Sequence, residues 1–85
     1  MYHDISRLRS AVDAVYEDVV ALRRHLHMHP ELSNEEHYTA SHIAEELDKI
    51  EGMEVYRDLA GGTGVMGLLR GKKGPGKVVL LRADI

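Results

Sequence analysis

The stretch HLHMHPELS, His25 to Ser33, decides the fold, because one hydrophobic pattern ends in it and another begins after it. Before it, apolar residues recur at alternating spacings of three and four, which is the pattern of one helix face: Ile5, Leu8, Val12, Val15, Val19, Leu22 and Leu26. Pro30 ends the pattern, since the residue before a proline is pushed out of helical geometry. The spacing predicts a helix over residues 4–28, capped by Asp4.

A second helix is predicted directly after this stretch, over residues 34–51. Ser33 and Glu36 have the spacing of a capping box, in which each side chain satisfies a backbone N–H at the start of a helix. The predicted apolar face consists of Ala40, Ile43, Ala44, Leu47 and Ile50. Gly52 is expected to end the helix.

After Gly52 the hydrophobic period becomes two, which indicates strands over residues 53–59 and 65–70. The chain closes on Val-Val-Leu-Leu-Arg-Ala-Asp-Ile, whose four consecutive apolar residues predict a strand over 78–85 with both faces covered. The predicted fold class is therefore α/β, with two helices followed by three strands. Two helices cover only one face of such a sheet, so we expect residues 1–85 to be the N-terminal part of a larger domain.

The composition narrows the possible partners. The 85 residues carry a net charge of −3 and no cysteine, which argues against general affinity for nucleic acid or anionic membranes and excludes thiolate metal sites. The N-terminal residues do not form the apolar core of a signal peptide, and no apolar stretch is long enough to span a membrane. We expect a cytoplasmic protein.

The histidines suggest a metal site, but the spacing gives it little support. His25 and His29 are four residues apart and could share a helix face, whereas zinc takes four ligands, or three and a water. No carboxylate has the His-Glu-x-x-His spacing, and Pro30 interrupts the helix. We interpret the stretch as a polar helix end, with a metal carrier that uses His25 and His29 as an alternative.

Two glycine-rich stretches resemble phosphate-binding loops in spelling only. Gly62–Gly67 reads G-x-G-x-x-G, and Gly71–Lys77 nearly matches the Walker loop. Both motifs need a following helix whose N-terminus faces the phosphate. Here strand patterns follow, so we interpret Gly61–Gly64 and Gly71–Lys77 as turns.

Asp84 is the strongest candidate site residue, with Arg82 beside it. Asp84 lies at the C-terminal end of the predicted central strand, where α/β folds place their chemistry. Arg82 lies two residues earlier and on the same side of the strand. Either the two residues form an ordinary strand-end ion pair, or Asp84 belongs to a functional site.

Read together, LRRHLHMHPELSNEEHYTASHIAEEL and GTGVMGLLRGKKGPGKVVLLRADI resemble the opening of metal-dependent amidohydrolases. The resemblance is to the aminoacylase, hippurate-hydrolase and indole-acetyl-amino-acid-hydrolase type of the zinc-peptidase-like superfamily. Its specific parts are Arg24-x-x-His27-x-His29-Pro30-Glu31-Leu32 and the closing Leu81–Ile85.

The resemblance implies a two-domain hydrolase, expected to form a homodimer, in which a pair of divalent metals, zinc or manganese, activates water against the amide of an N-acyl amino acid. The family's ligands lie downstream of Ile85, so no residue here is assigned as catalytic or as a metal ligand. Asp84 matches a residue that steadies a metal ligand in related peptidases, and Arg82 stands where those peptidases have histidine.

We therefore predict the N-terminal segment of a metal-dependent amidohydrolase, which binds no metal and is inactive by itself. The alternative is a self-standing interaction module that uses the apolar stripe of its first helix.

Overall fold

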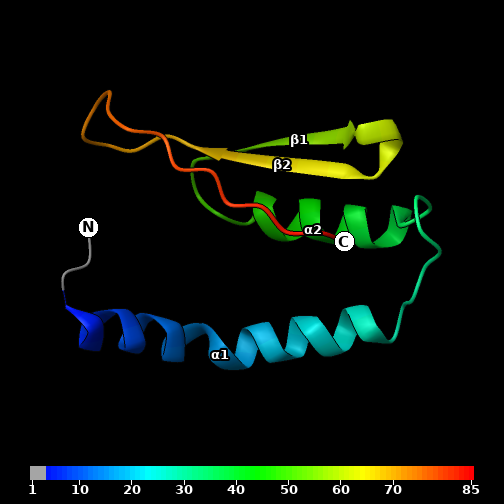
Figure 1. The fold of residues 1–85 in the computed structure, drawn as a ribbon, viewed down its shortest axis with the longest axis horizontal. Coiled ribbons are helices and arrows are strands. Elements are labelled where there is room, and N and C mark those ends of the chain that lie inside the picture. The colour runs from blue at the N-terminus through cyan, green and yellow to red at the C-terminus, as the bar shows by residue number, and fades with distance from the viewer. Residues whose placement is uncertain (1–3) are drawn as a thin grey trace. The chain divides into compact units, whose positions relative to one another are not determined.

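A computed structural model describes residues 4–85; the polar start of the sequence, Met1–His3, lies outside the described residues. The elements are helix α1 (Ile5–His27), helix α2 (His37–Asp48), strand β1 (Met53–Leu59), a 3-10 turn (Ala60–Gly62) and strand β2 (Gly64–Leu69) (Figure 1). The chain divides into two compact units, one ending at Pro30 and the other beginning at Glu31.

The first unit is helix α1, which forms where the apolar spacing predicts it. Asp4 caps it as expected: its carboxylate accepts a hydrogen bond from the backbone N–H of Ser6 at 2.9 Å. Basic side chains occupy the last turn, where they complement the negative end of the helix dipole. The apolar side chains of Ile5, Leu8, Val12, Val15 and Val19 are 44–68% exposed. Their packing against a sheet stays a prediction.

The second unit is helix α2 against an antiparallel hairpin of β1 and β2 (Figure 1). Ala40 and Ala44 are the buried residues of α2, at 7% and 1% exposure, and both belong to the predicted apolar face. Two alanines one turn apart let the helix backbone approach the hairpin closely. This contact is the small core of the unit.

The hairpin follows the predicted alternation. Met53 pairs with Leu69 and Tyr56 with Met66, and the pairing is interrupted before Leu59 pairs with Gly64. Asp58 lies in the interrupted segment with a φ of +58°, the left-handed geometry that an extra residue in a strand can require. The side chains of Met53 and Val55 are partly buried and those of their neighbours exposed, which confirms a strand with one wet face.

The predicted bounds of the second helix, 34–51 against the observed His37–Asp48, and the predicted third strand are wrong in this structure. The second helix begins at His37 and not at residue 34, because Asn34 adopts a left-handed φ of +66° that a helix cannot continue through. Residues 78–85 form no strand, and the side chains from Val78 to Leu81 are 82–91% exposed. A strand needs a paired neighbour, and an apolar strand needs cover on both faces; the described residues provide neither to this segment.

Candidate functional site

The HLHMHPELS stretch leads into the best-defined polar cluster of the described residues, which is centred on Glu31. One carboxylate oxygen of Glu31 accepts hydrogen bonds from the backbone N–H and the hydroxyl of Thr39, at 2.8 and 2.7 Å. The other oxygen accepts from the backbone N–H of Tyr38 at 2.8 Å. These are the free amides at the start of α2, so Glu31 caps that helix from outside it.

The capping box predicted from Ser33 and Glu36 is therefore wrong. Glu36 occupies the N-cap position of α2 but makes no side-chain capping hydrogen bond there. Its carboxylate accepts instead from the backbone N–H of Asn34, at 2.8 Å. Sequence reasoning missed Glu31 because capping rules consider residues three positions apart, and Glu31 lies seven and eight residues before its partners.

The histidines do not form a metal centre with this cluster. The rings of His25 and His29 contact each other, with centroids 4.8 Å apart and planes tilted by 51°. Within residues 4–85, no three histidine, cysteine or acidic side chains are grouped so that they could hold a metal ion. The residues described here do not fit the divalent metal site that the family resemblance implies.

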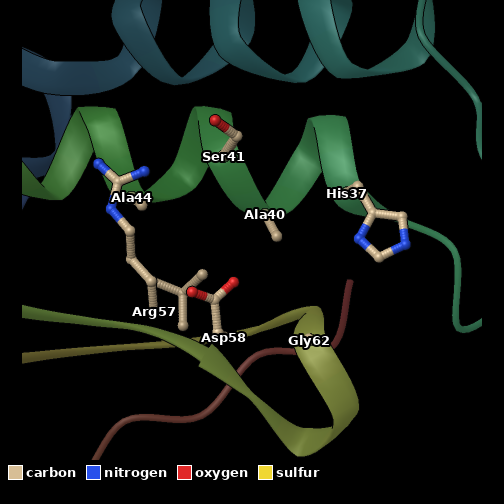
Figure 2. A pocket seen from close by; sticks show the side chains of 8 residues that line it. His37, Ala40, Ser41, Ala44, Arg57, Asp58 and Gly62 are labelled. Carbon is tan, nitrogen blue, oxygen red and sulfur yellow. The ribbon is translucent and has the colours of Figure 1, made fainter.

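A hollow of about 280 Å³ lies between α2 and the end of β1 (Figure 2). Ala40 and Ala44 form its apolar wall on α2. Its polar side chains come from α2 and from β1, and all four belong to exposed residues: His37, Ser41, Arg57 and Asp58. This hollow could not be predicted from the sequence, because its lining comes from residues of α2 and β1 that lie far apart along the chain.

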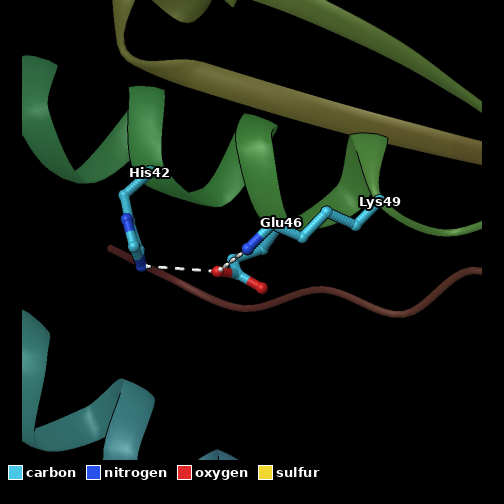
Figure 3. Close-up of polar contacts among 3 residues, drawn as sticks. All are labelled: His42, Glu46 and Lys49. Carbon is cyan, nitrogen blue, oxygen red and sulfur yellow. Dashed lines mark hydrogen bonds and ion pairs between the residues drawn. The ribbon is translucent and has the colours of Figure 1, made fainter.

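The polar side of α2 carries a small charged cluster (Figure 3). The carboxylate of Glu46 accepts a hydrogen bond from Nζ of Lys49 at 3.0 Å and lies 3.8 Å from Nε2 of His42. Pairs one helical turn apart on an exposed face contribute little to stability. We interpret this cluster as an ordinary solvated helix surface.

Arg82 and Asp84 lie together, as the sequence predicted for a pair on one side of an extended segment. A guanidinium nitrogen of Arg82 donates to the Asp84 carboxylate at 2.9 Å, and both side chains are more than 80% exposed. This is the ion pair that we weighed against a functional site. Whether Asp84 steadies a metal ligand stays a prediction.

The glycine-rich stretches behave as predicted. Gly64–Leu69 is strand β2, so no helix follows the G-x-G-x-x-G spelling as a dinucleotide site requires. Residues 71–77 contain turns and no helix, which excludes the Walker geometry as well.

Comparison with known proteins identifies relatives of the chain. It is 45% identical over 78 residues to an N-acyl-L-amino acid amidohydrolase of Geobacillus stearothermophilus, a match over 92% of this chain and 20% of the relative. It is 40% identical over 81 residues to thermostable carboxypeptidase 2 of Saccharolobus solfataricus, over 95% of this chain and 20% of the relative.

This chain is homologous to amidohydrolases and carboxypeptidases. An N-acetyl-L-cysteine deacetylase of Bacillus subtilis is also similar, at 41% identity over 81% of this chain and 16% of the relative. The chain spans about a fifth of the length of the curated relatives that it matches. No family model and no solved structure matches it.

These relatives confirm the resemblance drawn from the opening and closing motifs. No helix within residues 4–85 has the length and apolar character that crossing a membrane requires.

Proposed function

We propose that this chain is the N-terminal segment of a metal-dependent amidohydrolase that cleaves the amide bond of N-acyl amino acids. The observation that carries the proposal is the 45% identity, over 92% of the chain, to a protein named as an N-acyl-L-amino acid amidohydrolase. Zinc or manganese as the metal, a cytoplasmic location and a homodimeric assembly are parts of the same proposal.

In this proposal the segment supplies framework and not ligands. A divalent metal would lower the pKa of a bound water and polarise the substrate carbonyl. Since residues 4–85 contain no group of three metal-binding side chains, the ligands would come from elsewhere in the protein. The 85-residue chain alone is then expected to be inactive.

Asp84 is the one residue of the segment for which we propose a role near the metals. It would accept a hydrogen bond from a metal-binding side chain and hold that ligand in orientation, with Arg82 as its present partner in the structure. Loss of such a carboxylate typically lowers metal affinity or turnover about 10–100-fold.

The test is hydrolysis by the complete product of the source gene. We expect it to release free amino acids from N-acyl amino acids in the presence of zinc or manganese, and to lose activity with a chelator. Asp84→Asn should lower turnover or metal affinity, whereas Asp48→Asn at the exposed end of α2 should change neither. A metal-loaded protein that hydrolyses no amide would refute the proposal.

A further inference from the structure

The start of α2 lacks the cap that its own sequence is expected to provide. The first N–H groups of a helix have no partner within the helix and need an acceptor. The N-cap residue, Glu36, makes no side-chain capping bond. The carboxylate of Glu31 satisfies this need across a loop of several residues.

The loop between Glu31 and the helix is also held by its own hydrogen bonds. The backbone N–H of Glu35 donates to the carbonyl of Leu32 at 2.9 Å, and that of His37 donates to the carbonyl of Glu35 at 2.8 Å. The backbone N–H of Asn34 donates to the Glu36 carboxylate. Hydrogen bonds within the loop therefore hold its conformation, and the Glu31 carboxylate connects the start of the loop to the first turn of α2.

We propose that Glu31 is a latch, which fastens the segment after Pro30 to the first turn of α2 and releases it when the carboxylate is protonated. The carboxylate receives three hydrogen bonds, two from backbone amides and one from a hydroxyl. A negative charge at this end of a helix is also favoured by the helix dipole. The latch follows from these contacts and does not depend on the proposed function.

The electrostatics of the latch agree with its geometry. Partial burial of the Glu31 carboxyl acts to raise its pKa, but the hydrogen bonds from Thr39 and Tyr38 and the nearby His37 outweigh it. The net effect holds the pKa of Glu31 below its ordinary value of 4.5. The latch is then complete above that pH and opens as the pH falls through the lowered pKa.

The decisive experiment is amide hydrogen exchange at Tyr38 and Thr39 in the whole chain, measured by NMR. Glu31→Gln should speed exchange at these two amides by about 2- to 30-fold, the range typical of a lost helix cap. Glu35→Gln, the same change at an exposed position of the same loop, should leave both rates within about twofold of wild type. Equal rates in Glu31→Gln and wild type would overturn the latch.

A titration of the wild-type chain tests the same proposal without any variant. Followed by carbon-13 NMR, the Glu31 carboxyl should titrate with a pKa below its ordinary value of 4.5, and the Tyr38 and Thr39 amide signals should shift along with it. Amide signals that stay fixed while Glu31 titrates, or a Glu31 pKa at or above 4.5, would contradict the proposal.

Discussion

Replacing Ala44 with aspartate should nearly abolish the fold of the second unit. The Ala44 side chain is 1% exposed, on the face of α2 that packs on the hairpin, so a carboxylate there would lose its water, and the exposed Arg57 of the same hollow would offset that loss only in part. Such a group stays protonated instead, and holding its pKa about three units above the ordinary value costs about 4 kcal/mol at pH 7. A domain of this size is typically stable by only about 3–8 kcal/mol.

The free energy of unfolding can be followed by urea denaturation, with the amide NMR signals of β1 and β2 as the probe. We expect Ala44→Asp to lower the free energy of unfolding by about 3–4 kcal/mol, or to leave no folded hairpin. The matched control is Glu45→Asp, which places the same residue at the exposed neighbouring position and should cost less than about 0.5 kcal/mol. A loss below about 1 kcal/mol in Ala44→Asp would show that α2 does not pack on the hairpin through this face.

Three further changes test other parts of the structure. Gly64→Ala should destabilise the hairpin by about 1–2 kcal/mol, because its Cβ would lie 3.0 Å from the backbone of Leu59, its partner on β1, while Gly71→Ala meets nothing within 4 Å and should be neutral in the same urea assay. Arg70→Gln should raise the pKa of Glu54 in an NMR titration, because the hydrogen bond and the charge of Arg70 lower that pKa in the wild-type chain. The stabilisation by Glu54 is present above pH 4.5 and is lost as the pH falls through the lowered pKa. The free energy of unfolding of the variant should therefore decrease less on acidification than that of the wild type. Calorimetry with zinc should detect no submicromolar site at residues 25–29. Submicromolar binding that is lost when both His25 and His29 are replaced by alanine would contradict this prediction.

The regular elements could be predicted because their causes are local. The spacing of apolar residues in α1 and the alternation in β1 act over a few residues and are visible in the sequence. The start of α2 could not be predicted, since it depends on the left-handed backbone of Asn34 and on a carboxylate five residues before the N-cap. A strand over 78–85 requires neighbours that these residues alone do not supply.

The candidate site also contains features that the sequence could predict and features that it could not. The Arg82–Asp84 ion pair is one of the two alternatives that the sequence left open, and the two side chains could meet because residues two apart in an extended segment lie on the same side. The hollow beside α2 was not predicted, since it forms where the end of β1 lies against two small residues of α2. Homology to hydrolases was visible in two short motifs, which is a property of the sequence and not of this geometry.

The most direct test of the hydrolase assignment is the sequence of the source gene across codon 85. We predict an open reading frame that continues with an Asp-Ala-Leu-Pro stretch next to Asp84, and that later encodes a Cys-x-His pair and a pair of glutamates able to hold two divalent metals. A stop codon directly after Ile85 in an undamaged gene would leave the protein without metal ligands or a general base. The homology would then describe ancestry alone, and an interaction module would become the better account.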